Sequence, residues 1–261
     1  MQGRDIRDKL RSGQCVYGTH IVEAGNPNML LWELEAGMDF AFICTEHLPV
    51  DRKEVSWMCR LIAQQDVSPA VRIPYPSAHW ATMMIDGGAQ GIVAPYVEKP
   101  EQVEELIGAV RYRPIKGVFL EQILTGAREP ADKLKTFFDK FSGDLYLIIG
   151  VESVHAIENL DRLLAYDEVD GVFLGPHDIT CSMEIPEEYE NPRFLDTLKD
   201  VVRVCREKNK GVGLHCDYRV PLNEQMIDWG MNFILNLSDV TKARNALAED
   251  FEYFRAKKNQ G

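Results

Sequence analysis

Eight short apolar segments alternate with longer amphipathic segments along this chain of 261 residues. Each apolar segment has the length and the branched or aromatic composition of a buried strand. The predicted strands are 16–21, 40–44, 70–73, 91–94, 145–151, 171–174, 212–216 and 233–237. The predicted helices are 28–36, 51–64, 78–85, 100–110, 131–141, 154–165, 192–208, 221–229 and 238–255. Strands that alternate with helices pair in parallel through right-handed crossovers.

This alternation predicts an α/β fold, a closed (β/α)8 TIM barrel made by one domain, residues 1–261. The alternative is an open doubly wound sheet. No Gly-x-Gly-x-x-Gly motif follows the first predicted strand, and this favours the barrel. The stretch 111–129 has no clear period. We expect it to be a long loop over one end of the barrel.

The net charge of -12 and the sequence pI near 5.0 argue against nucleic acid and anionic membranes as partners. No segment has the roughly 18 apolar residues needed to span a bilayer. The six cysteines form no Cys-x-x-Cys pair, and the charged N-terminal segment has no apolar core of a signal peptide. We therefore expect reduced thiols and a cytoplasmic protein.

Two acidic residues follow predicted strands that would be neighbours in the barrel. Glu152 comes directly after strand 145–151, and Asp178 lies shortly after strand 171–174. A carboxylate at the end of a buried strand is unfavourable unless its charge is compensated. A divalent cation, which prefers oxygen ligands, is the simplest compensation.

Other polar residues fall near the same strand ends. Arg72 ends the third predicted strand, where it would hold a carboxylate or oxyanion or make a surface or interface ion pair. His47 follows the second strand, as a general base or as a surface residue. Asp86 ends the third predicted helix. Its carboxylate either orients His47 or a water molecule, or it is simply part of the helix end. Gly175 and Pro176 form a turn or expose backbone N–H groups to an anion.

All six histidines, at positions 20, 47, 79, 155, 177 and 215, lie at predicted strand ends or just after them. Metal ligation by some of them is an open alternative. None of the predicted strands contains lysine, so a Schiff-base mechanism is disfavoured. Activation of a carbonyl would then come from a metal.

Five segments occur in a fixed order: 46–49 (EHLP), 71–74 (VRIP), 86–97 (DGGAQGIVAPYV), 152–161 (ESVHAIENLD) and 170–178 (DGVFLGPHD). Together they resemble the HpcH/HpaI class II aldolases, metal-dependent enzymes that act on pyruvate-derived 2-keto acids. The resemblance implies a TIM barrel of the phosphoenolpyruvate/pyruvate type, in agreement with the strand count. It also implies a homo-oligomer, a trimer or hexamer, in which helix 238–255 is exchanged between subunits.

The resemblance further implies a role for each polar residue. Glu152 and Asp178 would bind Mg2+, Mn2+ or Co2+, and Arg72 would stabilise an enolate oxygen. His47, supported by Asp86, would transfer the proton. Backbone N–H groups of the turn formed by Gly175, Pro176, His177 and Asp178 would hold the substrate carboxylate.

The chain departs from the family pattern at several positions. Cys44 stands where the family usually has Asp, Gly150 where it has Gln, and His177 where it has a small residue. His20 replaces an aromatic or apolar pocket residue, and together with His177 and His215 it would make the pocket more polar. We infer a second substrate that differs from the semialdehydes usual in the family.

The function predicted from the sequence is a carbon–carbon lyase that joins or cleaves a pyruvate or hydroxypyruvate enolate and an aldehyde, with a small keto acid and an aldehyde as its partners. One alternative is a citrate-forming or CoA-ester-linked lyase on the same barrel. A second alternative is a keto-acid-binding homologue without turnover, consistent with the changes at Cys44 and Gly150.

Overall fold

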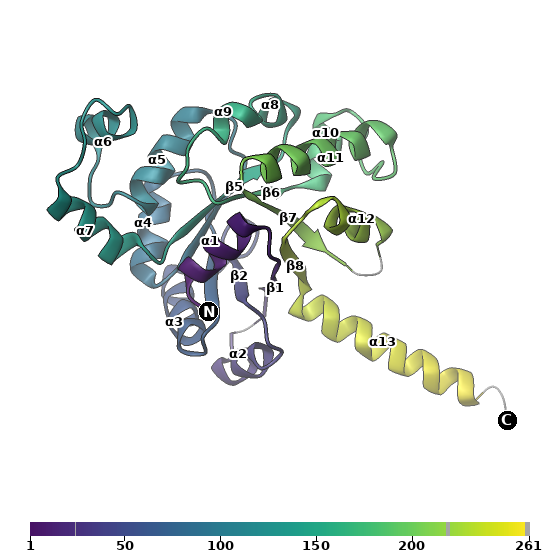
Figure 1. Ribbon diagram of the computed structural model, residues 1–261. Helices are drawn as coiled ribbons and strands as arrows, with labels where there is room; N and C mark the ends of the chain where they lie inside the picture. Colours follow the sequence, from purple (N-terminus) through teal and green to yellow (C-terminus); the bar gives the residue numbers. More distant parts are fainter. Residues whose placement is uncertain (24, 218–219, 259–261) are drawn as a thin grey trace.

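The computed structural model describes residues 1–23, 25–217 and 220–258, and it contains a closed barrel of eight parallel strands (Figure 1). The strands are β1 (Val16–Ile21), β2 (Phe40–Cys44), β3 (Ser68–Arg72), β4 (Gly91–Ala94), β5 (Tyr146–Val151), β6 (Gly171–Leu174), β7 (Gly211–Cys216) and β8 (Phe233–Ser238). Each strand pairs with the next in the sequence, and β8 pairs with β1. The predicted (β/α)8 barrel is confirmed.

The helices surround the barrel or close its ends. They are α1 (Gly3–Ser12), α2 (Pro27–Leu34), α3 (Arg52–Gln64), α4 (Ala78–Gly87), α5 (Pro100–Val110), α6 (Gly117–Leu124), α7 (Asp132–Ser142), α8 (Val154–Glu158), α9 (Leu160–Leu163), α10 (Pro176–Ser182), α11 (Pro192–Glu207), α12 (Pro221–Trp229) and α13 (Asp239–Lys258). The prediction of a loop at 111–129 was wrong, because α6 lies within it. The predicted helix 154–165 is divided into α8 and α9, and α1 and α10 were not predicted.

The strands separate two apolar layers, as the alternation of side chains along each strand requires. The inner layer fills the barrel with aromatic rings, including those of Phe40 and Phe233, whose centroids are 4.3 Å apart. Glycine makes room for such rings: a Cβ on Gly91 would lie 2.2 Å from the ring of Tyr146. The outer layer packs the strands against the helices. Side chains therefore fill the barrel below the rim, and a substrate would bind at the end formed by the carboxyl termini of the strands.

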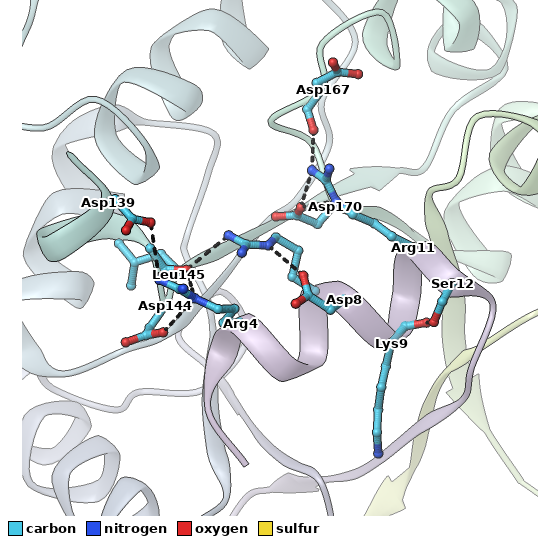
Figure 2. Close-up of polar contacts among 12 residues, drawn as sticks. Arg4, Asp8, Lys9, Arg11, Ser12, Asp139, Asp144, Leu145, Asp167 and Asp170 are labelled. Carbon is cyan, nitrogen blue, oxygen red and sulfur yellow. Dashed lines mark hydrogen bonds and ion pairs between the residues drawn. The ribbon is translucent and has the colours of Figure 1, made fainter. Parts of the chain in front are cut away.

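The N-terminal helix α1 closes the lower end of the barrel. Its Ile6 and Leu10, spaced four residues apart, are fully buried against the inner layer. Its charged face is fixed by ion pairs. Figure 2 shows Arg11 reaching the carboxylate of Asp170 and the carbonyl of Asp167. Arg4 lies between the carboxylates of Asp139 and Asp144 in the same view. These contacts hold α1 over the amino ends of the strands.

The C-terminal helix α13 extends away from the barrel (Figure 1). It has 20 residues and buries none of them against the described part of the chain. Several of its large apolar side chains are exposed: Val240, Leu247, Phe251, Tyr253 and Phe254. Most of the stability of a helix in a protein comes from packing against other elements, and α13 has little such packing within the described part of the chain.

None of the described helices is both long and apolar enough to cross a membrane. All six cysteines are free thiols, as expected. The cytoplasmic location stays a prediction.

Candidate active site at the carboxyl ends of the strands

The last inward-facing residues of several strands form the floor of an open mouth. His20 comes from β1, Cys44 from β2, Arg72 from β3 and His215 from β7. Every second side chain of a strand points into the barrel, and each of these four residues lies two positions after another inward-facing residue. All four side chains therefore point into the mouth. The sequence-based placement of these residues at one rim agrees with this arrangement.

The carboxylates of Glu152 and Asp178 converge beside Gly175. Glu152 follows β5 directly, whereas Asp178 lies in the first turn of α10, which follows β6. A Cβ on Gly175 would be 3.0 Å from Asp178 Oδ2 and 3.0 Å from Glu152 Cγ. The absent side chain at Gly175 therefore lets the two acidic residues approach each other. No group of three His, Cys, Asp or Glu suited to a metal ion occurs among the residues that the structure describes.

Glu152 is in an unfavourable environment for a negative charge. It is only 5% exposed. Burial, followed by the charges of Glu46 and Asp178, raises its pKa to about 7, although Arg72 and the backbone N–H of Tyr96 act in the opposite direction. A bound cation would remove this conflict, because it would compensate both carboxylates at once.

Arg72 is held firmly at the floor of the mouth. It is 7% exposed and lies 5.8 Å above the ring of Phe42. Its Nε and Nη2 donate hydrogen bonds to Cys44 Sγ at 3.3 and 3.1 Å. Its Nε also forms an ion pair with Glu46 Oε2 at 3.1 Å. A carboxylate in the position of the Cys44 thiol would neutralise the charge of Arg72 more completely. With a thiol there, more of the positive charge of Arg72 remains available to a substrate.

His47 and Asp86 do not meet within this chain. His47 lies just after β2 at the rim, with its side chain 66% exposed and its Nε2 3.6 Å from Glu46 Oε2. Asp86 is near the carboxyl end of α4, which in a βα unit lies at the opposite end of the barrel. There it pairs with Arg113 at 2.7 Å. The expectation that Asp86 supports His47 is not met inside one copy of the chain.

His20 and His215 lie next to each other in the floor. Their ring centroids are 5.5 Å apart, and both rings contact Phe42 edge-on. Burial and the charge of Arg72 are among the causes that lower the pKa of His20 to about 4 and that of His215 to about 3. Both imidazoles are therefore neutral near pH 7.

The turn at Gly175 and Pro176 starts helix α10. Pro176 is its first residue, and Gly175 is its N-cap, without a capping side chain. The first N–H groups of a helix have no partner within it, so this turn presents donors to the mouth. His177 points elsewhere: its side chain is largely exposed, and its Nδ1 lies 3.8 Å from Glu187 Oε1.

Two features of the site were not anticipated from the sequence. Glu46 pairs with Arg72, and the backbone at Tyr96 donates to Glu152. Tyr96 has a φ of 51°, a left-handed conformation that is rare for a bulky residue. Strain of this kind is typical of functional sites. Gly150 also has a local reason, because a Cβ there would lie 2.8 Å from Glu152 Oε1.

The family model "HpcH/HpaI aldolase/citrate lyase" matches residues 22–246. The chain belongs to the HpcH/HpaI family. The family predicted from the motifs is thereby confirmed, and with it the class of enzyme, a carbon–carbon lyase.

Named relatives of this HpcH/HpaI protein are aldolases. A hydroxypyruvate/pyruvate aldolase of Agrobacterium fabrum is 26% identical over 87% of this chain and 88% of that protein. A 2-keto-3-deoxy-L-rhamnonate aldolase of Escherichia coli is 26% identical over 97% of this chain and 94% of that protein. The crystal structure of an HpcH/HpaI aldolase from Desulfitobacterium hafniense has a TM-score of 0.80, covers 96% of both chains and is 22% identical. The two relatives agree with the sequence-based prediction of an aldolase, and the solved structure agrees with the barrel fold.

Proposed function

We propose that this protein is a metal-dependent aldolase that joins or cleaves a pyruvate or hydroxypyruvate enolate and an aldehyde. The observation that carries this proposal is the convergence of Glu152 and Asp178 on Gly175, next to the buried Arg72. The aldolase names of the relatives support the reaction class, and the convergence supports a site at these residues.

Glu152 and Asp178 fit a divalent cation as its two protein ligands. Both are carboxylates, the ligand type that Mg2+ and Mn2+ prefer, and two protein ligands leave positions for water and for a chelating keto acid. The raised pKa of Glu152 is the sign of a carboxylate pair that needs a positive partner. When bound, the metal supplies Lewis acidity to the keto acid. The choice among Mg2+, Mn2+ and Co2+ stays open.

Three groups of the chain would act on the keto acid. The N–H groups at the start of α10 bind its carboxylate. Arg72 stabilises the negative charge that develops on the keto oxygen when a methyl proton leaves or the carbon–carbon bond breaks. In the synthetic direction the enolate carbon attacks the aldehyde carbon, and the new alkoxide takes a proton. His47, at the rim, is the candidate for moving that proton, directly or through water.

We further propose that the protein works as a homo-oligomer. The exposed apolar side chains of α13 need a partner surface, and a second copy of the chain would supply one. Asp86 could support His47 only from another copy, because the two lie at opposite ends of one barrel. Replacing both Leu247 and Phe251 with Glu should then convert the oligomer to monomers in sedimentation velocity. The matched change Asn245→Glu, at a polar position of the same helix, should not.

Exchange of the pyruvate methyl protons with D2O, followed by NMR, tests the proposed chemistry without any aldehyde. Exchange should require a divalent metal and stop after treatment with EDTA. Full exchange in EDTA would contradict the proposal. Pyruvate binding by calorimetry without exchange would instead support the alternative of a binding protein without turnover.

A further inference from the structure

A pair of imidazole nitrogens in the mouth has no hydrogen-bond partner. His20 Nε2 and His215 Nε2 are both buried from solvent, and neither finds a partner in the part of the chain that the structure describes. Buried polar groups in native proteins are nearly always hydrogen-bonded, so two such nitrogens on neighbouring rings require a reason. A group that binds there would provide it.

The pair faces the mouth rather than the packed interior. His20 is the fifth residue of β1 and His215 the fifth of β7, so both sit above the aromatic layer of Phe42 and Phe173. A histidine with a purely structural role would instead have its nitrogens bonded to backbone or to side chains. The two rings thus form a polar patch on an otherwise apolar part of the floor.

The two histidines lie at different distances from the carboxylates around the barrel. His20 is on β1, four strands from β5, which leads to Glu152, whereas His215 is on β7, next to β6, which leads to Asp178. A keto acid held near Glu152 and Asp178 therefore leaves the β1 side of the mouth to the other substrate. The patch is placed to contact that substrate.

We propose that His20 and His215 bind hydroxyl groups of the second substrate, so that the aldehyde used by this enzyme is a hydroxyaldehyde. This inference rests on the proposed aldolase function and adds the chemical class of the acceptor. The two histidines act as residues that determine specificity. They do not take part in forming the enolate.

A hydroxyl group matches this patch better than a carboxylate does. A neutral imidazole nitrogen is a donor or an acceptor according to its tautomer, and a hydroxyl can pair with either. A carboxylate only accepts, and it would be favoured by protonated rings. Burial keeps both rings neutral, and the nearby charges of Arg72 and His47 also disfavour a proton, although Asp239 favours one on His20. A second substrate with a terminal carboxylate is therefore disfavoured here.

An apolar aldehyde is also disfavoured, because it would leave both nitrogens buried and unpaired. Each neutral hydrogen bond of this kind contributes roughly tenfold in selectivity. Two such bonds predict a preference of about 10²-fold for a hydroxylated aldehyde over its deoxy analogue.

The experiment measures kcat/KM for aldol addition of pyruvate to matched aldehydes: glycolaldehyde against acetaldehyde, and glyceraldehyde against propanal. Succinic semialdehyde tests the carboxylate. The variants are His20→Phe, which keeps a ring, His215→Leu, and the double variant. His79→Phe, an exposed histidine of α4, is the matched control. The hydration of each aldehyde is the same for every variant, so changes in the ratio report on the protein.

Each single variant should lower the hydroxy-to-deoxy ratio about tenfold, and the double variant should nearly abolish it. The control should keep the wild-type ratio. Pyruvate proton exchange should stay within about threefold of wild type in all variants, because the enolate side is untouched. An unchanged ratio, or a wild-type preference for propanal or succinic semialdehyde, overturns the hydroxyl subsite alone. Absence of metal-dependent exchange in the wild type overturns the proposed function and the subsite with it.

A second readout does not depend on turnover. The ring nitrogens of 15N-labelled histidine report protonation and hydrogen bonding by NMR. Glyceraldehyde, added without pyruvate or metal, should shift the signals of the two buried imidazoles, and propanal at the same concentration should not. Equal shifts with both aldehydes would contradict hydroxyl recognition.

Discussion

Two buried carboxylates, Asp170 and Glu152, lie at opposite ends of the same barrel and are treated in opposite ways. Asp170 is 0% exposed and is paired with Arg11 at 2.8 Å and with Arg111, and it also accepts the N–H of Leu147 at 2.9 Å. Glu152 is nearly as buried, but its neighbours include two further acidic residues, and its pKa rises to about 7. The negative charge of Asp170 is fully compensated, whereas that of Glu152 is not.

This difference separates stability from function within one fold. At the amino ends of the strands, Asp170 joins α1, the segment after α5 and β5 into one network. At the carboxyl ends, the sequence tolerates repulsion between carboxylates that a proton or an added cation can relieve. In barrel enzymes the carboxyl end is where active sites occur. Substitutions at the two ends of the barrel test this difference.

Asp170→Asn should destabilise the fold by about 3–5 kcal/mol, because it leaves the poorly exposed Arg111 without its counter-charge. Urea unfolding at neutral pH measures the change. Activity per folded molecule should be unchanged. Asp167→Asn is the matched control, since Arg11 contacts only the backbone carbonyl of Asp167, and it should stay within about 0.5 kcal/mol of wild type. If Asp170→Asn lowered the free energy of unfolding by no more than the control does, the ion-pair network would not be a stabilising element.

Glu152→Gln should lower metal-dependent aldol cleavage by about 10³-fold or more, which corresponds to the several kcal/mol that a metal contributes. Its metal-free fold should be at least as stable as that of the wild type, in contrast to Asp170→Asn. Steady-state rates and the binding of Mn2+ followed by electron paramagnetic resonance check both parts. Glu158→Gln, an exposed residue of α8, should behave as wild type. Normal Mn2+ affinity in Glu152→Gln would contradict the assignment of Glu152 as a ligand.

Arg72→Lys should lower kcat about 10²-fold with a smaller change in KM, because a lysine keeps the charge but loses the planar fork that Cys44 and Phe42 position. Single-turnover kinetics separate this effect from product release. Arg60→Lys, on the exposed face of α3, is the control. A change in KM alone would mean that Arg72 only binds the ground state.

The barrel could be predicted from the sequence because each strand is a short apolar run with a definite end. All eight strands agree with the prediction within two residues. Helix α1 was missed because its charged residues obscure a narrow apolar stripe of Ile6 and Leu10. Helix α6 was missed because it buries no residue, so its sequence has no clear inward face.

The convergence of Glu152 and Asp178 was predictable for the same reason as the strands, since both residues follow buried runs that end at one rim. His47 and Asp86 do not meet within one chain, because the helix that follows a strand runs back to the opposite end of the barrel. Support of His47 by Asp86 stays a prediction. The contacts of Arg72 with Cys44 and Glu46 depend on side-chain conformations in three dimensions. No spacing in the sequence encodes them.

The smallest effect concerns the pH dependence of stability without metal. The pKa of Glu152 is raised in the folded protein from 4.5 to about 7, so the folded state binds this proton more tightly than the unfolded chain does. Below pH 4.5 the side chain is neutral in both states, and wild type and Glu152→Gln should be equally stable. As the pH rises toward 7, the wild type should lose stability relative to Glu152→Gln, by about 2–3 kcal/mol once Glu152 is ionised.

Thermal and urea unfolding in EDTA, across this range, measure the difference between the two proteins. His20 and His215 titrate in both, so their contribution cancels. Added Mn2+ should reverse the order near pH 7, because a ligand that binds only the folded wild type stabilises it by mass action. A difference that stays flat with pH would mean that Glu152 ionises as freely as an exposed carboxylate. The contrast with Asp170 would then lie in geometry alone and not in charge.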